Sequence, residues 1–342
     1  MKKQLLLLSI LTFAAFGAIA QNFVRVDSIQ FVSATDLANC EDESAYDGQT
    51  VRTVGIVIHD GNLTEVASGS VNGGYRPGVM IVDTADGGKM GGFRAIEVHG
   101  VYEDGSGQNQ PVSALDNLVA GMIIEVTGEV GGFSGGTQLN PSDASSVRVI
   151  GTTAVPKPEI IDLGLLNDDS RTNILTTGEE WEGSYVTIED VTVTSVNTFS
   201  GNRVSFDVVD GEGNTINVSD RYAAQKLASR TLVNPSSPYT AGPFVAPIVG
   251  TKYASLSGII FHSQNGCTGS NGRGYELNPF DTADYKVGDT PPSITEVTRN
   301  PLVPSDADAV TISAKIIDFN GTVDEQSLYY STDISDAIAN FT

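Results

Sequence analysis

Cysteine and histidine are scarce in this 342-residue sequence. It contains two cysteines, Cys40 and Cys267, and three histidines, His59, His99 and His262. Two cysteines are too few for a disulfide framework or for a cluster of thiolate metal ligands. They either pair in a single disulfide or remain as separate thiols. A catalytic cysteine is not indicated, because no histidine stands in a recognisable nucleophile motif.

Long apolar runs are also missing after the first twenty residues. Lys2-Lys3 precedes an apolar run over residues 5–16, and residues 18–20 (Ala-Ile-Ala) have the small-x-small pattern that signal peptidase cuts. This run is too short for a membrane-spanning helix, and no later stretch approaches the roughly 18 apolar residues that such a helix needs. We therefore predict a signal peptide at 1–20 with cleavage after Ala20, a secreted or cell-surface protein, and no membrane insertion.

Basic residues are outnumbered by acidic ones. The chain has 19 Lys and Arg against 42 Asp and Glu, a formal net charge of −23. Such a charge repels nucleic acids and anionic membranes, because nucleic-acid binding draws much of its affinity from phosphate neutralisation by Lys and Arg. A nucleic-acid site on this chain must therefore concentrate basic residues locally.

What the sequence does contain is typical of an extracellular β-rich protein. It has 37 Gly, 14 Pro and 11 Tyr, with frequent Val and Thr and few long helix-forming runs. The length predicts two to three domains.

The chain also repeats itself once. In each copy an aromatic residue, an acid and a glycine open an alternating strand, a strand pair follows around an acidic glycine-rich turn, and a last strand pair ends in Leu-Asn-Pro. A short helical stretch is expected before the last pair, at 111–121 and 221–230. Each copy thus predicts five strands with a helix between the third and the fourth. The matching segments are 46–57 with 181–192, 78–100 with 203–222, and 121–141 with 250–279.

Two stretches carry a resemblance to a known fold. VVDGEGNTINV (208–218) resembles the hairpin of nucleic-acid-binding OB barrels, and LVAGMIIEVTG (118–128) resembles the entry to their fourth strand. The tandem arrangement after a signal peptide is similar to OB-like regions of secreted Bacteroidetes multidomain proteins, some of which also carry nuclease or phosphatase domains. The resemblance covers residues 36–288. It implies an all-β chain with two tandem five-stranded OB-like Greek-key barrels, each with a short helix.

The C-terminal segment predicts a further β domain. Asp289-Thr290-Pro291-Pro292 reads as a linker, and residues 293–333 read as three strands with a turn at Asn320-Gly321. This pattern resembles the first half of an immunoglobulin-like β-sandwich, which takes about 100 residues. Only 54 residues follow residue 288, so we expect a partial, truncated sandwich. The predicted organisation is an N-terminal strand or leader (21–35), barrel 1 (36–150), a linker (151–175), barrel 2 (176–288) and the partial sandwich (289–342).

The acidic turn Asp210-Gly211-Glu212-Gly213 has two interpretations. Glycine supplies the positive φ of tight turns and Asp and Asn tolerate it, which favours a simple hairpin loop. Asp210, Glu212 and Asn214 also alternate as oxygen donors and are weak calcium candidates. Calcium takes six to eight oxygen ligands, more than this loop provides, so we favour the hairpin.

Other groups with catalytic potential have plain structural interpretations. His59 and His99 end strands close to carboxylates, where they either bind a transition metal or, as we favour, are ordinary polar strand ends. His262 is expected to begin a loop. The acid pairs Asp168-Asp169 and Glu179-Glu180 are expected to be solvated. With no phosphate-binding loop either, we predict a protein that is not an enzyme and has no cofactor.

Ligand-binding residues follow from the OB-like resemblance. OB barrels bind oligonucleotides or oligosaccharides on strands 2 and 3 and on the loops joining strands 1–2 and 4–5. Aromatic residues with interleaved Arg suit bases and phosphates, and aromatics with Asn, Asp and Gln suit sugars. Phe206 and Phe261, in mid-strand, are expected to fill the barrel instead. The candidates are Tyr75, Arg76, Lys89, Phe93, Arg94 and Phe133 in the first copy, and Phe199, Arg203, Arg221, Arg273 and Tyr275 in the second.

The sequence thus predicts a non-catalytic, exported binding module that binds single-stranded nucleic acid or an oligosaccharide. Two alternatives remain. One is a structural or adhesive spacer, favoured by the acidic, glycine-rich surface. The other is the accessory region of a secreted nuclease or phosphatase whose catalytic domain lies elsewhere.

Overall fold

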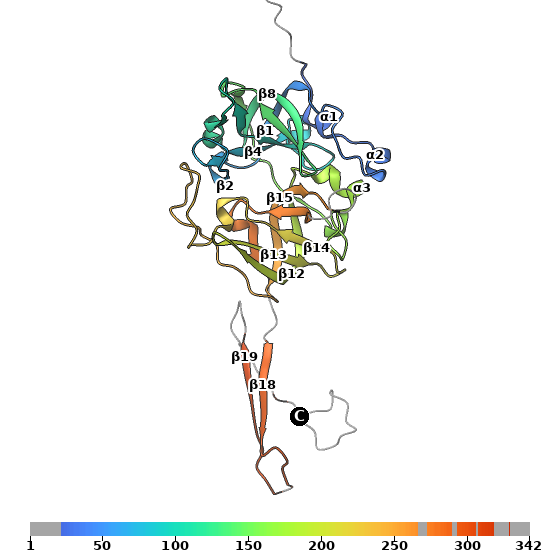
Figure 1. Ribbon diagram of the computed structural model, residues 1–342. Coiled ribbons are helices and arrows are strands. Elements are labelled where there is room, and N and C mark those ends of the chain that lie inside the picture. Colours follow the sequence, from blue (N-terminus) through green and yellow to red (C-terminus); the bar gives the residue numbers. More distant parts are fainter. Residues whose placement is uncertain (1–21, 266–271, 289–292, 306, 318–327, 329–342) are drawn as a thin grey trace, which may run out of the picture.

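The computed structural model describes residues 22–265, 272–288, 293–305, 307–317 and 328. The predicted signal peptide, Cys267 and the predicted third strand of the C-terminal segment lie outside these residues. The described part consists of several β-sheets with short helices (Figure 1), which confirms the all-β prediction.

Five strands of the first copy form a sheet that closes on itself. Their order is β1-β4-β5-β9-β8, and β8 pairs back to β1. All neighbours are antiparallel except β5 and β9, which are parallel. A sixth strand, β10, adds to the outer side of β8. The bounds are β1 Thr50–Val57, β4 Gly78–Asp83, β5 Ala95–His99, β8 Met122–Phe133, β9 Gly136–Pro141 and β10 Val147–Thr152.

The second copy has the same topology. Its order is β12-β13-β14-β16-β15 with β15 paired back to β12, and β14 and β16 are again the parallel pair. Short strands β11 and β17 extend it at β12 and β15. The bounds are β11 Glu159–Ile160, β12 Tyr185–Phe199, β13 Arg203–Val209, β14 Thr215–Val218, β15 Lys252–Ser263, β16 Gly274–Asn278 and β17 Tyr285–Val287.

The internal repeat corresponds to equivalent positions in the two sheets. Leu139 and Leu277 of the Leu-Asn-Pro motifs are both fully buried on the parallel strand. A glycine faces each motif on the neighbouring strand: a Cβ on Gly128 would lie 2.3 Å from the Asn140 oxygen, and one on Gly258 would lie 2.7 Å from the Asn278 carbonyl carbon. Only glycine allows this close backbone approach.

The predicted helices between the third and fourth strands are single 3₁₀ turns, η3 (Ser113–Asn117) and η6 (Ala223–Gln225). They are shorter than the stretches 111–121 and 221–230 expected from the sequence. Pro111 lies in a short strand, β7 (Asn109–Pro111), rather than in a first helical turn.

The N-terminal segment corrects the prediction of a leader strand at 21–35. After one bridge between Phe23 and Arg52, the chain forms helix α1 (Val26–Gln30) and then α2 (Ala34–Ala38). Val26 and Ile29 lie on one face of α1 and are fully buried in the core of barrel 1. Burial of these two side chains, one helical turn apart, outweighs the β preference of isolated Val and Ile.

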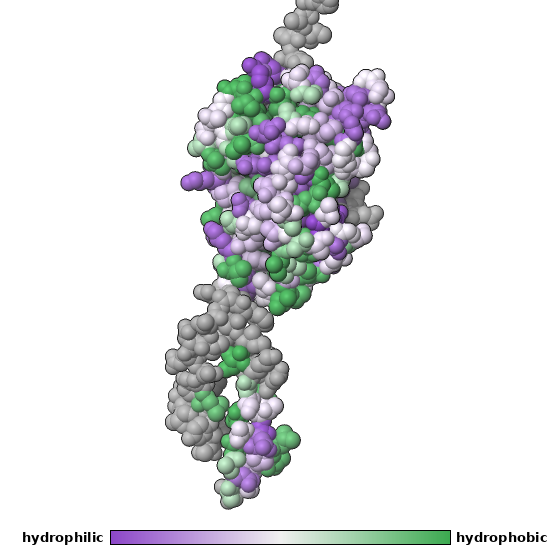
Figure 2. Space-filling view, turned by 90° about the vertical axis from the view of Figure 1, so that its left-hand side faces the viewer, coloured by the Kyte–Doolittle hydropathy of each residue, from purple (hydrophilic) through white to green (hydrophobic). Residues whose placement is uncertain are grey.

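The two barrels pack directly against each other. An apolar cluster contains Ile56, Met80 and Val82 of the first copy together with Tyr222 and Ile259 of the second. In the space-filling view the two barrels form one continuous body (Figure 2). The barrels are therefore joined by a shared core.

The segment 151–175, predicted as a linker, is packed as well. Ile161, Leu163 and Leu175 join the core of barrel 2, as does Leu166, which is fully buried. Asn167 in the same segment donates hydrogen bonds to the backbone oxygens of Thr215 and Tyr275. The segment is thus an integral part of the second barrel.

The turn at residues 210–213 joins β13 to β14 as predicted. Asp210 Oδ1 accepts hydrogen bonds from the backbone of Glu212 and Asn214, both at 2.9 Å, and its Oδ2 accepts one from Asn214 Nδ2. The Asp210 carboxylate therefore holds the hairpin turn, which is the interpretation favoured from the sequence.

Three further observations complete the fold. β18 (Ser293–Asn300) and β19 (Thr311–Ile317) form an antiparallel hairpin, the described part of the predicted sandwich. Cys40 is disulfide-bonded, which excludes a free thiol there, and Cys267 lies outside the described residues. No helix in the described ranges is long and apolar enough to cross a membrane.

Candidate ligand-binding cleft between the two barrels

A cleft of about 550 Å³ lies between the barrels and is lined by residues of both. On the barrel 1 side, Met80, Glu97 and Gln138 stand side by side in register on β4, β5 and β9. These are the second, third and fifth strands of the barrel. On barrel 2, Glu276 of β16 occupies the position that corresponds to Gln138, and it lines the same cleft. The ligand face that the OB-like resemblance implies is thus directed into this cleft.

The cleft concentrates basic residues in an otherwise acidic chain. Six of the 19 Lys and Arg line it, together with five Asp and Glu, so its formal charge is +1 and that of the rest of the chain is −24. The basic residues are Arg76, Arg203, Arg221, Lys226, Arg230 and Arg273, and the acidic ones are Glu65, Glu97, Glu182, Asp220 and Glu276.

Three of the cleft arginines lie over phenylalanine rings. The guanidinium carbon of Arg221 is 4.1 Å from the centroid of Phe261, that of Arg273 is 5.4 Å from Phe199, and that of Arg76 is 5.9 Å from Phe133. These separations are within the range of cation–π interactions. The cleft therefore presents guanidinium groups and aromatic rings beside each other.

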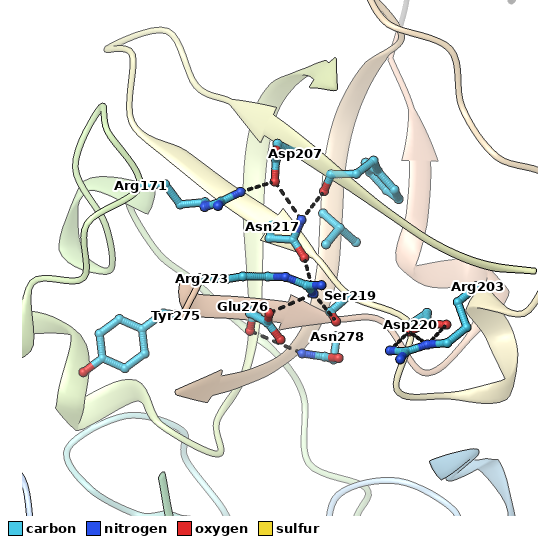
Figure 3. Close-up of polar contacts among 12 residues, drawn as sticks. Arg171, Arg203, Asp207, Asn217, Ser219, Asp220, Arg273, Tyr275, Glu276 and Asn278 are labelled. Carbon is cyan, nitrogen blue, oxygen red and sulfur yellow. Dashed lines mark hydrogen bonds and ion pairs between the residues drawn. The ribbon is translucent and has the colours of Figure 1, made fainter. Parts of the chain in front are cut away.

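Arg273 is fixed by a network on the outer face of barrel 2 (Figure 3). Its NH1 donates to Asn217 Oδ1 at 3.2 Å, to Ser219 Oγ at 3.4 Å and to Glu276 Oε1 at 3.1 Å. Burial raises the pKa of Glu276, while the charge of Arg273 opposes this effect. The network holds the Arg273 side chain in place before any ligand arrives.

A second charged group centres on Asp220, whose side chain is 3% exposed. Arg203 binds it through two nitrogens, with NH2 to Oδ1 at 2.7 Å and Nε to Oδ2 at 3.2 Å. Lys226 Nζ lies 3.4 Å from Oδ2 and donates to the Asp220 backbone oxygen. Burial lowers the pKa of Lys226 to about 8, because the interior disfavours its charged form.

The barrel 1 wall is organised around Glu97. Arg221 of the second copy forms an ion pair with it across the barrel boundary. Burial alone would raise the pKa of Glu97, but the neighbouring charges, led by Arg221, hold it below its usual value. Glu97 is therefore an anion that positions Arg221 beside Phe261.

The structure brings five of the eleven predicted ligand-binding residues together in the cleft. Phe199 lies against Arg273 at the edge of this group. Phe93 packs against Phe31 and Arg94 pairs with Asp86, both outside the cleft, and Lys89 is exposed elsewhere. The predicted residues that line the cleft are Arg76, Phe133, Arg203, Arg221 and Arg273.

Four expectations about aromatic residues have different outcomes. Tyr75, expected at the surface, is buried and its hydroxyl donates to Asp116 Oδ2 at 2.6 Å. Tyr275 is also buried, with its hydroxyl donating to Glu179 Oε2 at 2.7 Å. Phe206 fills the barrel as expected. Phe261, expected to do the same, instead lines the cleft, where Arg221 lies over its ring.

Several cleft residues were missed by reasoning from the sequence. Lys226 and Arg230 lie in a stretch interpreted only as a helix. Gln138 and Glu276 precede the repeated Leu-Asn-Pro motif at the same position, which is a signal that would have identified them. No sequence pattern identifies Asp220, because its ion pairs with Arg203 and Lys226 form only in the folded chain.

A cluster of buried polar groups lies at the wall of the cleft. Glu179, the first residue of the 3₁₀ turn η5 (Glu179–Trp181), Glu182, which follows this turn, and His262 of β15 are all buried. Glu179 was expected to be solvated and His262 to begin a loop, and both expectations are wrong because the packing of the barrels covers them. Burial raises the pKa of Glu179 to about 8 and also raises that of Glu182.

The other two histidines have no such carboxylate cluster among the described residues. His59 is 1% exposed, with Nδ1 3.0 Å from the Asp60 backbone oxygen and Nε2 accepting from the backbone N–H of Met80 at 3.3 Å. Burial lowers its pKa to about 4. His99 is half-buried at the end of β5, and burial lowers its pKa as well.

Comparisons with known proteins give similarities to solved structures alone. No family model matches the sequence, and no curated protein matches it. Among solved structures, a murine DNA-binding protein bound with double-stranded DNA is similar with 12% sequence identity and a TM-score of 0.28. The similarity covers 70% of this chain and 97% of that chain. A TM-score this low carries no argument about the fold or the ligand of this protein.

Proposed function

We propose that this protein is an exported, non-catalytic binding module that holds single-stranded nucleic acid in the cleft between its two barrels. The observation that carries the proposal is a set of three arginine–phenylalanine pairs, two in the cleft and one at its edge, in a cleft that collects six of the 19 basic residues. Single-stranded nucleic acid is bound by such combinations, because bases stack on aromatic rings and phosphates contact cationic side chains.

The distribution of the arginines over both walls of the cleft supports binding of a flexible anionic strand rather than a rigid duplex. The cleft is a confined space between two barrels, and its arginines are spread over both walls. A single strand can turn its bases and phosphates toward different walls. The acidic remainder of the chain repels phosphates outside the cleft, which confines binding to this place.

A titration of labelled single-stranded oligothymidylate against the chain, followed by fluorescence anisotropy, tests this function. We expect saturable binding that weakens with salt, with a slope of log K against log salt of about −0.7 for each phosphate contact. The variants Arg273→Ala and Phe133→Ala are each expected to weaken binding about 5- to 150-fold, corresponding to about 1–3 kcal/mol per stacked base.

Arg148→Ala is the matched control. Arg148 is an exposed arginine on β10 whose NH2 lies 2.9 Å from Glu125 Oε1, and it does not line the cleft. Its removal changes the net charge as much as Arg273→Ala does, yet it should leave the affinity unchanged. If Arg148→Ala and Arg273→Ala lower the affinity for the oligonucleotide equally, binding depends only on the net charge, and this result would contradict a site in the cleft.

An oligosaccharide is the second candidate. Four of the six basic cleft residues already have an acidic partner, namely Arg203 and Lys226 with Asp220, Arg221 with Glu97, and Arg273 with Glu276. Such neutral polar pairs beside aromatic rings also suit sugar hydroxyls. Absence of DNA binding at low salt, with binding to a glycan array that Phe133→Ala weakens, would favour this candidate. Absence of both would leave the spacer alternative.

A further inference from the structure

The buried cluster beside the cleft has the composition of a metal site. His262 Nδ1 is 3.6 Å from Asp42 Oδ2, 3.6 Å from Glu179 Oε2 and 3.9 Å from Glu182 Oε2. One ligating atom from each of Glu179, Glu182 and His262 lies within 4.8 Å of the others. Ligands on a tetrahedral zinc ion are about 3.4 Å apart, the edge of a tetrahedron with bonds of about 2.1 Å. The three distances from His262 Nδ1 to the carboxylates, 3.6–3.9 Å, are slightly longer than this value.

Two atoms directed into the cluster have no hydrogen-bond partner. They are His262 Nδ1 and Glu182 Oε2, and their side chains are 1% and 6% exposed. Buried polar atoms in proteins are almost always paired, so each needs an explanation. The distances to His262 Nδ1 are too long for hydrogen bonds within the cluster. A cation between the four side chains would satisfy both atoms at once.

Neighbouring groups orient the two glutamates of the cluster. Glu182 Oε1, which points away from His262, accepts from the backbone N–H of Thr137 at 2.7 Å. Glu179 Oε2, the oxygen that faces His262 Nδ1, also accepts from the Tyr275 hydroxyl at 2.7 Å. The His262 ring stacks on that of Tyr275, with ring centroids 4.7 Å apart. Such outer contacts orient the ligands of metal sites.

Asn173 completes this outer shell. Its side-chain nitrogen Nδ2 lies 3.1 Å from His262 Nε2, its oxygen Oδ1 has no partner, and a rotation of the amide by 180° exchanges the two atoms. The amide orientation in which this oxygen accepts from Nε2–H satisfies both groups. It also leaves the Nδ1 lone pair directed toward the carboxylates, as metal binding requires.

An acidic cavity lies beside the cluster. It has a volume of about 340 Å³ and is lined by Asp42, Glu43, Asp47 and Thr137, whose backbone N–H donates to Glu182. Three carboxylates at its wall attract a cation and repel anions. Asp42 lines this cavity and also lies in the cluster, 3.6 Å from His262 Nδ1.

We propose that Asp42, Glu179, Glu182 and His262 form a binding site for one divalent transition-metal ion of the zinc class. One imidazole with three carboxylates suits zinc better than calcium, since calcium takes oxygen ligands in larger number. The ligands come from the N-terminal segment, from η5 and from barrel 2, so the ion would tie these parts together. Glu182 and His262 of this site also line the cleft, so metal binding and ligand binding in the cleft are measured separately.

The test uses the untagged chain, stripped with a chelator and titrated with Zn²⁺ by calorimetry. We expect one ion per chain and a melting temperature that rises with Zn²⁺, while Ca²⁺ in excess does not displace it. His262→Gln and Asp42→Asn should each weaken Zn²⁺ binding more than ten-fold. Asp42 is only half-buried, so its variant keeps the test valid if His262→Gln fails to fold.

His99→Gln is the matched control, because this substitution removes a partly buried histidine that is not part of the cluster. The variant should bind Zn²⁺ with the same affinity as the unmodified chain. Zn²⁺ binding of equal strength in all variants would show binding to scattered surface acids and would overturn the proposal. So would the absence of saturable binding, or full displacement of Zn²⁺ by Ca²⁺. Titration of single-stranded DNA against the metal-free chain tests the proposed function independently of Zn²⁺ binding, so the two proposals can fail separately.

Discussion

Single basic residues in the cleft have acidic partners that do not fully neutralise them. Asp220 is buried and receives two cations, Arg203 and Lys226, so this group keeps a positive charge. Arg76 lies near Glu97 without an ion pair, and burial lowers its pKa. Fixed, partly desolvated cations lose little side-chain entropy on binding. Competition from their acidic partners should in turn make binding moderate and sensitive to salt.

His59 gives a prediction at the same scale. Its Nε2 already accepts from Met80 N–H, so a proton on that nitrogen would break the contact and place a charge in the apolar cluster between the barrels. Its pKa, lowered from 6.5 to about 4, means that the folded state favours the neutral ring. This stabilisation is complete above pH 6.5 and is lost as the pH falls toward 4. It amounts to about 3 kcal/mol.

Urea unfolding between pH 7 and pH 4 measures this effect, with His59→Gln as the reference. The carboxylates titrate in both proteins, so the difference between them isolates His59. We expect the unfolding free energy of the unmodified chain to fall more steeply with decreasing pH than that of the variant. NMR titration of the three imidazoles gives a direct check, and a His59 pKa near 6.5 would contradict the prediction.

At the scale of elements, much of the fold follows from local patterns. The strands around 204–218 and 121–141 were predicted because alternation and turn residues are read within a few positions. Because the same pattern occurs in both copies of the repeat, two separate stretches of the sequence supported each strand assignment. Helix α1 was missed, because its apolar face consists of only two residues, Val26 and Ile29. Glu179 and His262 are more than 80 residues apart in the sequence, and no local sequence pattern indicates that they lie close together in the fold.

The β13–β14 turn gives a prediction for an element. Asp210→Ala removes three hydrogen bonds that hold the turn and should lower the unfolding free energy by about 1–3 kcal/mol in urea titrations. Glu212→Ala is the matched control in the same turn, since Glu212 is exposed and contributes only its backbone N–H. Calcium should change neither melting temperature. A calcium-induced rise that Asp210→Ala abolishes would restore the metal interpretation of this loop.

At the scale of the whole molecule, both candidate sites depend on how the barrels meet. The cleft has walls from both barrels, and Glu182 of the buried cluster accepts from Thr137 of the first. Gln30 of α1 donates to the Ala95 backbone oxygen at 2.7 Å and to Glu182 at 3.4 Å, so the N-terminal segment joins the same contact. Two barrels with a common core are expected to unfold in one cooperative transition.

Gly91 is the position that tests this coupling. It has φ +73°, its backbone N–H donates to Ser184 Oγ, and a Cβ there would lie 2.7 Å from the Trp181 ring across the boundary. Gly91→Val should push Trp181 away, split the calorimetric transition in two and weaken ligand binding. Gly107→Val is the matched control, because Gly107 has φ +80° with open space around it. That variant carries only the backbone strain of about 1–2 kcal/mol and should keep a single transition and full binding. If both variants behave alike, strain alone explains the loss, and the barrels are not coupled through this contact.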